Sequence, residues 1–160
     1  MHTERPRNVR AVIGALAAAA VAAFALAQDP MPPQMAGAVT DIALAQSSEF
    51  GPYLVDQNGR ALYLFVPDAQ GASTCYDDCA TNWPPVLVVS PDTMPVPGEG
   101  LDATLLGTVE RDDGSLQVTY NGWPLYLYMG DMEAGVANGH GLGGNWFLVD
   151  PAGNAVPAAN

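Results

Sequence analysis

Hydrophobic and polar residues alternate with a period of two in two stretches of the chain, and the second stretch echoes the first 63 positions later. Residues 53–66 and 116–129 each place an Asn-Gly pair, at 58–59 and 121–122, between two apolar runs. An Asn-Gly pair readily adopts the positive φ of a tight turn, so each stretch predicts a β-hairpin. An internal repeat of this kind predicts one supersecondary unit used twice around a shared core.

Further segments predict strands that complete the two repeats. Residues 83–89 and 146–149 are expected as closing strands, and residues 105–110 are expected to pair with 117–120 across a turn. Only residues 77–82 leave room for a short helix. The sequence therefore predicts an all-β single domain built from two pseudo-symmetric repeats of short antiparallel strands, with at most one short helix near the cysteines.

The central strand of each repeat is apolar on both faces. Tyr63 and Phe65 share one face of the first strand, as Tyr126 and Tyr128 do in the second, while leucines take the opposite faces. A strand of this kind is expected to be covered on both sides. Core packing is the favoured interpretation of the aromatic face, and the alternative is a surface for a haem, a sugar or a quinone.

The N-terminal region has the pattern of a secretory signal peptide. Three arginines precede an apolar run from residue 11 to 26, and Ala25-Leu26-Ala27 offers a small-x-small cleavage site. The alternative is a membrane anchor, but the run is shorter than the roughly 20 residues of a bilayer span. Cleavage there removes the apolar run, so we expect no transmembrane anchor in the mature protein. No cysteine lies near residue 28, so we also expect no lipid attachment at that site. The expected location is periplasmic or extracellular.

Changes in composition along the rest of the chain predict where the leader, the repeats and the tail begin and end. Residues 28–48 are rich in Pro, Ala and Gln and are expected to form a flexible leader, and a Pro- and Gly-rich stretch near residues 90–100 separates the repeats. The predicted organisation is a signal peptide (1–27), a leader (28–48), a secreted two-repeat domain (49–152, with repeats about 50–90 and 105–152) and a flexible tail (153–160).

The balance of charge is strongly acidic. The chain has 17 acidic and five basic side chains, of which one acid and three arginines precede residue 28, so residues 28–160 carry a net charge of −14. Such a surface repels phosphate backbones and anionic lipid headgroups, which disfavours nucleic acids as partners. Cationic partners and envelope proteins remain, and solubility alone would also explain the charge. The oligomeric state is left open.

A motif of the form Y-x-[FWY]-x-x-D occurs twice, in Tyr63–Asp68 and in Tyr126–Asp131, and each copy is followed by an Asn-Trp pair that ends at Trp83 or Trp146. With these motifs, residues 50–152 resemble a bacterial secreted-repeat family, the lipoproteins with a Yx(FWY)xxD motif. The resemblance implies an extracytoplasmic domain of unassigned biochemical function. Many members carry a lipid-anchoring cysteine, which this chain lacks at the cleavage site.

The motif aspartates, Asp68 and Asp131, follow their strands where the chain must turn. An aspartate in this position commonly accepts hydrogen bonds from backbone N–H groups two residues on, so a structural cap is the leading interpretation. Calcium is the alternative, with Asp77 or Asp78 as further ligands. No loop has the D-x-D-x-D-G spacing of a calcium-binding loop.

Cys75 and Cys79 are the two cysteines of the chain. Because disulfides persist outside the cytoplasm, a structural bridge is the favoured interpretation. Positions four apart in a regular helix hold their Cβ atoms too far apart for a disulfide, so the loop is expected to be irregular. The alternative is a thiolate pair for Cu(I) or for redox exchange.

His140 is the sole histidine after the signal peptide and lies in a glycine-rich loop that aligns with the cysteine loop of the first repeat. An exposed loop histidine is the simplest interpretation. The alternative is a copper site made by His140 with Met129 and Met132, and copper is the one cofactor that this sequence suggests. The residues alone do not identify a cofactor.

No familiar catalytic motif occurs after residue 27, and the chain has no lysine for a Schiff base. We therefore predict a secreted cell-envelope binding or structural module without recognisable catalytic machinery. The alternative is an extracytoplasmic copper-binding or electron-transfer protein that uses the cysteine pair and the His/Met site. An acidic hydrolase with paired carboxylates is a third hypothesis.

Overall fold

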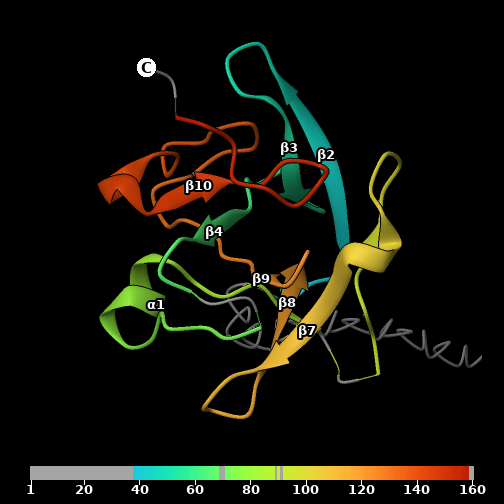
Figure 1. The fold of residues 1–160 in the computed structure, drawn as a ribbon, viewed down its shortest axis with the longest axis vertical. Helices are drawn as coiled ribbons and strands as arrows, with labels where there is room; N and C mark the ends of the chain where they lie inside the picture. The colour runs from blue at the N-terminus through green and yellow to red at the C-terminus, as the bar shows by residue number, and fades with distance from the viewer. Residues whose placement is uncertain (1–37, 69–70, 89, 91, 159–160) are drawn as a thin grey trace, which may run out of the picture. The chain divides into compact units, whose positions relative to one another are not determined.

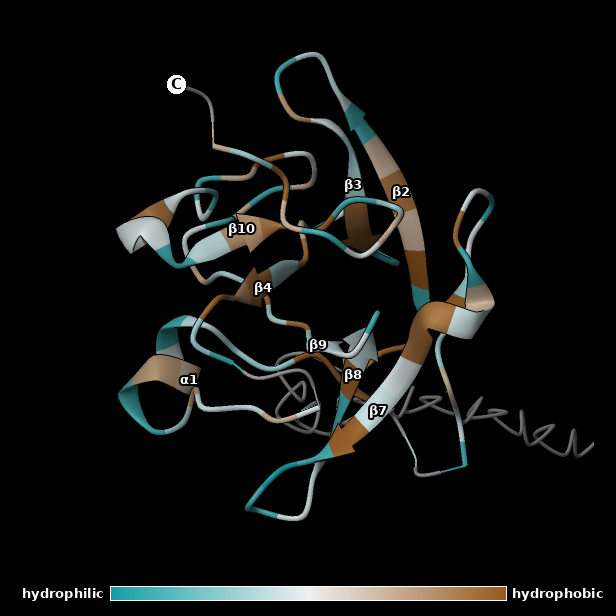
Figure 2. Cartoon of the chain, in the orientation of Figure 1, coloured by the Kyte–Doolittle hydropathy of each residue, from teal (hydrophilic) through white to brown (hydrophobic). Residues whose placement is uncertain are grey.

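The fold is described from a computed structural model, in which residues 38–68, 71–88, 90 and 92–158 are placed well enough to describe. These residues belong to one compact unit, Pro32–Asn160. Figure 1 shows the unit as short strands joined by long loops, and Figure 2 shows hydrophobic residues gathered in the strands and hydrophilic ones at the turns. The elements are β1 (Ala38–Val39), β2 (Asp41–Ser47), β3 (Gly51–Asp56), β4 (Tyr63–Phe65), α1 (Asp78–Asn82), β5 (Leu87–Val88), β6 (Val96–Pro97), η1 (Ala103–Leu105), β7 (Leu106–Glu110), β8 (Leu116–Tyr120), β9 (Trp123–Pro124), η2 (Leu142–Gly144) and β10 (Trp146–Leu148).

The strands form three small sheets. One sheet has the order β1-β5-β8-β7 with β9 added to β8, a second pairs β10 with β4, and a third has the order β3-β2-β6. The pairings are antiparallel except for β1 with β5 and β2 with β6, which are parallel. The predicted all-β class with one short helix near the cysteines is therefore confirmed.

The two copies of the repeat meet at their motif tyrosines. The backbone N–H of Tyr63 donates to the carbonyl of Tyr126 at 2.9 Å, and the N–H of Tyr126 donates back to Tyr63 at 2.9 Å. A second matched pair flanks this contact, because Val66 donates to the carbonyl of Asn145 at 2.8 Å and Met129 donates to that of Asn82 at 3.0 Å. Both pairs are related by the 63-residue shift, so the repeats pack around a pseudo-twofold axis between the two tyrosines.

The central strand of each repeat separates two hydrophobic clusters, as the two-sided apolar pattern predicts. Leu62 and Leu64 point into one cluster together with Leu125 and Leu127 of the second repeat. The tyrosines between them point into the other cluster, which also holds both repeat tryptophans and Cys75. All four leucines are buried. Neither repeat could close these clusters alone, because each cluster takes side chains from both copies.

The cysteine loop is irregular, as predicted. The Cys75–Cys79 disulfide joins Cα atoms 5.2 Å apart, with Cys75 before α1 and Cys79 within it. Asp77 lies between them with a φ of 50°, a left-handed conformation that breaks the helical path. This break lets the two sulfur atoms meet across a span that a continuous helix would keep apart.

Two predicted boundaries are wrong where the structure describes them. The expected flexible leader contains β1 and β2, in which Val39 and Ile42 are buried in the core. In the expected flexible tail, Ala155 forms a bridge with Val149 of the domain and Val156 is buried. Both segments contain few large apolar residues. A few buried side chains are nevertheless enough to hold such a segment on the fold when its backbone also forms hydrogen bonds with neighbouring strands. The predicted signal peptide, residues 1–27, lies outside the described residues.

Candidate functional site

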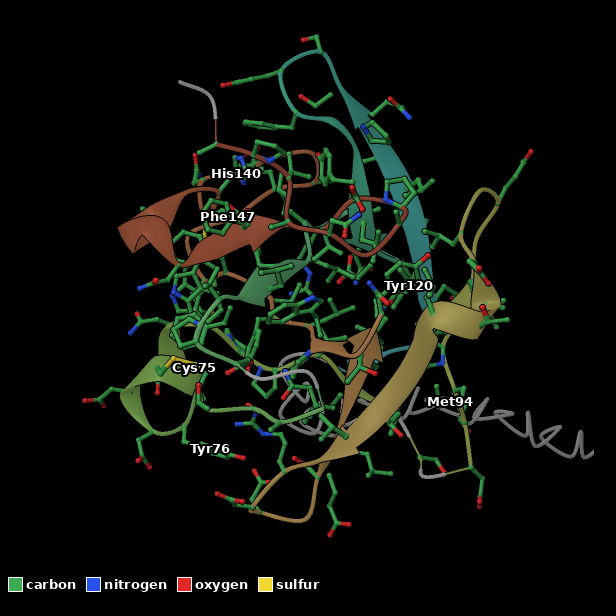
Figure 3. All side chains as sticks on the ribbon, viewed as in Figure 1. Cys75, Tyr76, Met94, Tyr120, His140 and Phe147 are labelled. Atoms are coloured by element: carbon green, nitrogen blue, oxygen red, sulfur yellow. A yellow bond between two sulfur atoms is a disulfide. The ribbon has the colours of Figure 1, made fainter. Side chains whose placement is uncertain are left out.

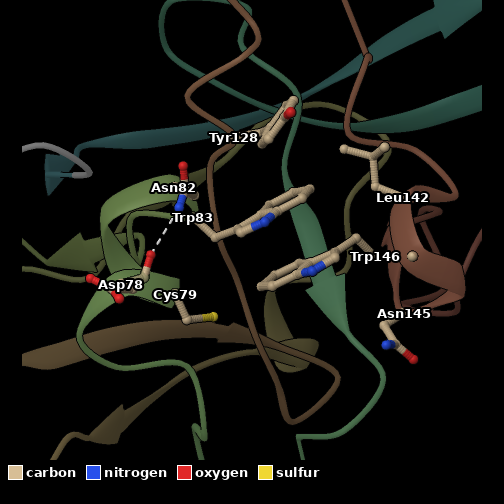
Figure 4. Close-up of a pocket in the computed structure, with 9 residues that line it drawn as sticks. Asp78, Cys79, Asn82, Trp83, Tyr128, Leu142, Asn145 and Trp146 are labelled. Carbon is tan, nitrogen blue, oxygen red and sulfur yellow. Dashed lines mark hydrogen bonds between the residues drawn. The ribbon is translucent and has the colours of Figure 1, made fainter.

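Four aromatic rings stack in a row where the repeats meet. Trp83 and Trp146, which occupy equivalent positions, lie face to face with ring centroids 3.8 Å apart and planes inclined by 1°. Tyr128 stacks on the other face of Trp83 at 4.3 Å, and Phe65 stacks on the other face of Trp146 at 4.1 Å. Tyr128 and Phe65 are themselves equivalent, so the row obeys the same pseudo-symmetry as the fold. Figure 4 shows the two indoles between Tyr128 and the loop of Asn145.

Each motif tyrosine reaches across to the aspartate of the other repeat. The hydroxyl of Tyr63 donates to Asp131 Oδ2 at 2.5 Å, and the hydroxyl of Tyr126 donates to Asp68 Oδ2 at 2.6 Å. The ring of Tyr63 also meets the edge of Trp83, with centroids 5.3 Å apart. All four polar partners are buried. The repeated motif is therefore a reciprocal brace that ties the two copies together around the aromatic row.

The aspartates act as caps, but not with the expected partners. Asp68 Oδ1 accepts from the backbone N–H of Thr74 at 2.8 Å and from its hydroxyl at 2.6 Å, and Asp131 Oδ1 accepts from the N–H of Asn138 at 2.8 Å. These amides lie six and seven residues on, rather than two, because each aspartate holds the start of a long loop rather than a tight turn. Among the described residues, no group of three or more His, Cys, Asp or Glu side chains is placed to hold a metal ion.

Burial decides the protonation of this brace. Removal from water raises the pKa of the Tyr63 and Tyr126 hydroxyls far above the ordinary value, and the hydrogen bond to each aspartate raises it further. Burial also raises the pKa of the Asp131 carboxyl, against the hydrogen bonds from Tyr63 and Asn138 that lower it. The phenols are thus held as donors throughout the neutral range, which is the form that the brace requires.

A buried arginine that the repeat pattern did not reveal supports the brace. Arg111 follows β7 and is 4% exposed. Its Nη1 donates to Ser73 Oγ at 2.7 Å and to Gln117 Oε1 at 2.6 Å, and its Nη2 donates to the carbonyl of Cys75 at 2.7 Å. Because the hydroxyl of Tyr126 donates to its aspartate, it accepts in turn from Ser73 Oγ at 2.7 Å. A continuous hydrogen-bonded chain therefore joins Arg111 to the second tyrosine–aspartate pair.

A sequence signal for Arg111 did exist. It is one of two basic residues after residue 27, and a lone arginine in so acidic a segment is a candidate for a structural role. The ring of Tyr76 covers the guanidinium, with 4.4 Å between the ring centroid and Cζ. The hydrophobic pattern gave no indication of this, because Arg111 directly follows a strand in an exposed-looking turn.

A cavity of about 500 Å³ opens beside the tryptophan pair, between α1 and η2. These two segments are repeat equivalents, so the cavity lies between matched positions of the two copies. Asn82 and Asn145 flank it at equivalent places, and Asp78 lies on the α1 side (Figure 4). The residues that line the cavity are Asp78, Cys79, Asn82, Trp83, Tyr128, Leu142, Gly143, Asn145 and Trp146.

The tryptophans offer donors to this cavity. Within the described part of the chain, the indole N–H groups of Trp83 and Trp146 have no protein acceptor, and neither nitrogen counts among the buried unpaired polar atoms. Each indole is 7% exposed, so an edge rather than a face is accessible. The amide of Asn82 donates to the carbonyl of Asp78 at 3.0 Å, which leaves its oxygen as an acceptor. The cavity thus combines apolar ring edges with a few donors and acceptors.

The predicted copper residues lie in different surroundings. The ring of His140 contacts the rings of Phe50 and Phe147; Figure 3 labels His140 and Phe147. Its Nδ1 accepts from the backbone N–H of Leu148 at 3.2 Å, and its Nε2 lies 3.3 Å from the carbonyl oxygen of Pro157. Both ring nitrogens are therefore occupied. The two methionines line a separate cavity of about 210 Å³ beside Asp131, and His140 is not among its lining residues. The methionines are Met129, 56% exposed, and Met132, 84% exposed.

The two cysteines are joined in a disulfide and are not free to bind copper as thiolates. With Cys75 and Cys79 in a disulfide, their sulfur atoms present no thiolate to Cu(I). Cys79 nevertheless lines the large cavity, so the bridge positions α1 against the tryptophan pair. In the described part of the chain, no helix has the length and apolar character needed to cross a bilayer.

A family model described as a secreted repeat of unknown function matches residues 45–87 and, a second time, residues 107–150. The chain belongs to this family. The two matches cover more than half of the chain and confirm both the internal repeat and the resemblance inferred from the motifs. Membership supports export and leaves open whether the protein is periplasmic or extracellular. No curated protein and no solved structure matches the chain.

Replacing Tyr63 with phenylalanine tests the brace that the family motif builds. We expect a loss of about 1.5–3 kcal/mol in the free energy of unfolding, because a buried carboxylate oxygen loses its donor. Urea unfolding of Tyr63→Phe measures this loss, and Tyr126→Phe should behave similarly. Tyr76→Phe is the control, since its hydroxyl only accepts from an exposed backbone N–H. A Tyr63→Phe protein as stable as the control would contradict the brace.

Alkaline pH should unfold the domain through its buried phenols. The pKa of Tyr53, Tyr63 and Tyr126 is raised above the ordinary value of 10.0, mainly by burial. Above this value the unfolded chain loses phenol protons that the folded chain keeps, so stability falls as the pH rises. We expect the tyrosinate absorbance of these three residues to appear only together with loss of the circular dichroism signal. Full ionisation of all six tyrosines in a still-folded protein would contradict this.

Proposed function

We propose that this domain is an extracytoplasmic binding module without catalytic machinery, and that its ligand sits in the cavity between α1 and η2. The observation that carries the proposal is the tryptophan pair, whose indoles line the cavity and whose N–H groups have no acceptor among the described residues. Apolar walls with a few convergent polar groups are the usual composition of a small-molecule site. The cavity volume of about 500 Å³ also lies in the usual range for such sites.

The lining favours a neutral ligand rich in hydroxyl groups, such as a short glycan. No lysine, arginine or histidine lines the cavity, and Asp78 brings a carboxylate, so an anionic ligand would meet no compensating charge. The overall net charge of the chain adds to this repulsion. Hydroxyl groups both donate and accept, so they can match the indole N–H groups and the amides of Asn82 and Asn145 at once. Leu142 and the ring edges would cover the apolar side of such a molecule.

The surroundings of the buried acids support a binding role over hydrolysis. Asp68 and Asp131 each accept a tyrosine hydroxyl on one oxygen and a backbone amide on the other. A general base needs a lone pair aimed at its substrate, and these carboxylates direct their oxygens at the scaffold instead. The copper alternative has no comparable support, because the cysteines are bridged and both nitrogens of His140 are occupied.

The test is a calorimetric screen of neutral oligosaccharides with a paired variant. Asn82→Ala combined with Asn145→Ala removes the two flanking amides and leaves the aromatic row intact. We expect affinity to fall about tenfold or more, which corresponds to roughly 1.4 kcal/mol. Asn58→Ala is the matched control, because Asn58 is an exposed asparagine in a hairpin turn far along the sequence from the cavity. Equal affinity of the double variant and the control, or no binding by any neutral saccharide, would overturn the proposal.

A further inference from the structure

The aromatic row touches the tyrosine–aspartate brace, and the combination supports a chemistry that ligand binding does not need. Rings in contact pass electrons easily, and a phenol that is hydrogen-bonded to a carboxylate can release an electron and a proton together. We propose that the row is a one-electron relay in which Tyr63 is the terminal electron donor and Asp131 accepts its proton. The relay uses the cavity only as the point of access and does not depend on the ligand proposed above.

The path for the electron is short and continuous. Trp83 lines the cavity, so an oxidant there lies against its indole. Tyr63 meets the edge of Trp83 with centroids 5.3 Å apart and planes inclined by 82°. Trp146 stacks on Trp83 with ring centroids 3.8 Å apart and parallel planes, so the positive charge of an oxidised indole is shared between the two rings. Each step of the path is a van der Waals contact.

The path for the proton is a single hydrogen bond. An oxidised phenol is a strong acid, so tyrosine gives up an electron readily only when a base can take its proton. The hydroxyl of Tyr63 already donates to Asp131 Oδ2 at 2.5 Å, within the reach of direct proton transfer. Burial raises the pKa of the Asp131 carboxyl, which makes its carboxylate a better proton acceptor than an exposed one.

An oxidising radical or a high-potential metal complex at the cavity takes one electron from Trp83 and is itself reduced by one electron. Tyr63 returns one electron to Trp83 while its O–H bond breaks and the proton passes to Asp131. The products are the reduced oxidant, a neutral tyrosyl radical and a neutral carboxylic acid. Charge is conserved, because the carboxylate that is neutralised matches the charge gained by the oxidant.

The two halves of the brace differ, and the difference selects Tyr63. Asp68 accepts the N–H and the hydroxyl of Thr74 on one oxygen, and the chain of hydrogen bonds from Arg111 leads to its other oxygen. Asp68 therefore already accepts two hydrogen bonds besides that of its tyrosine, and these occupy the carboxylate that the phenol proton would have to join. Asp131 has one backbone amide besides its tyrosine among the described hydrogen bonds, and no cation.

Pulse radiolysis with the azide radical tests the relay. This oxidant prefers tryptophan and carries no charge, so the acidic surface does not repel it. The measurements use a Trp123→Phe background, because oxidation then starts at the stacked pair, the two tryptophans that remain. We expect the absorbance of the tryptophan radical to decay as that of a tyrosyl radical grows, at a rate independent of protein concentration. A rate proportional to protein concentration, or no tyrosyl radical, would overturn the relay.

The repeat provides the matched control for the donor. Tyr63→Phe keeps the ring and removes the oxidisable hydroxyl, and Tyr126→Phe does the same in the equivalent position against Trp146. We expect Tyr63→Phe to remove most of the rapid tyrosyl growth and Tyr126→Phe to preserve it. Equal loss in both variants, or the reverse order, would overturn the assignment of Tyr63.

The brace is unmutated in the Trp123→Phe background, which gives a second readout that does not depend on how the tyrosine variants fold. Because the proton moves with the electron, transfer in the Trp123→Phe protein should be at least about twofold slower in heavy water than in ordinary water. A rate that is the same in both solvents would contradict proton transfer to Asp131.

Discussion

Replacing Trp146 with alanine is expected to lower the free energy of unfolding by about 3–5 kcal/mol, the usual cost of removing a large buried aromatic ring. Trp146 is 7% exposed and contacts Trp83 and Phe65 on its two faces and Tyr126 at its edge. Its removal would leave a gap that the backbone of β10 cannot close, since that strand is fixed to β4 by its register. A domain of this size has only about 5–15 kcal/mol of stability to lose.

Urea unfolding of Trp146→Ala measures the effect, and Trp123→Ala is the matched control. Trp123 is a half-buried tryptophan in β9 that packs against the other hydrophobic cluster and takes no part in the row. Its removal should cost clearly less than that of Trp146. If both variants lost the same stability, the aromatic row would contribute no more than ordinary packing.

Replacing Arg111 with methionine is expected to cost about 3 kcal/mol, since each buried acceptor left without a donor costs about 1–3 kcal/mol. Three acceptors depend on the guanidinium: the buried Gln117 Oε1 and carbonyl of Cys75, and the half-buried Ser73 Oγ. Methionine keeps most of the alkyl stem, so the loss reports on the hydrogen bonds. Lysine should not restore stability, because a single ammonium group cannot span the planar fork that these acceptors require.

Thermal or urea unfolding of Arg111→Met is compared with that of Arg60→Met. Arg60 pairs with Asp56 at 2.7 Å; the side chain of Arg60 is 36% exposed and that of Asp56 is fully buried. We expect Arg60→Met to lose less stability than Arg111→Met, because it leaves one carboxylate oxygen without its donors whereas Arg111→Met leaves three acceptors. A smaller loss for Arg111→Met than for Arg60→Met would show that the buried network does not support the fold.

The periodic part of the fold could be predicted from the sequence because period and turn chemistry are local properties. The Asn-Gly turns predict the hairpins, and the two-sided apolar pattern of residues 62–65 predicts a strand between two clusters, which the structure confirms. Strand β2 was missed because Ala43 and Ala45 fill the positions between Ile42 and Leu44 and beyond, so the segment shows an apolar run rather than an alternation. Ile42 and Leu44 carried the signal, and the proline-rich stretch before them obscured it.

The residues of the site could be predicted from the sequence, but their contacts could not. Pattern indicates which face a side chain takes, but not which partner it meets, so nothing in the chain says that Tyr63 pairs with Asp131 rather than with Asp68. The pairing of each tyrosine with the aspartate of the other repeat results from the pseudo-twofold packing. The stacking of Trp83 on Trp146 follows from the same packing, and so does the cavity beside it. The cysteine loop and the glycine loop, where the two copies carry different residue types, both border the cavity.

The most direct test of the account is a titration of isotope-labelled protein with a neutral oligosaccharide from the screen, followed through the three indole N–H signals in a nuclear magnetic resonance spectrum. Ligand in the cavity must approach Trp83 and Trp146 and must leave Trp123 untouched. The account predicts saturable shifts of the first two signals with one shared affinity and no shift of the third. Binding that leaves the signals of the stacked pair unmoved would contradict it.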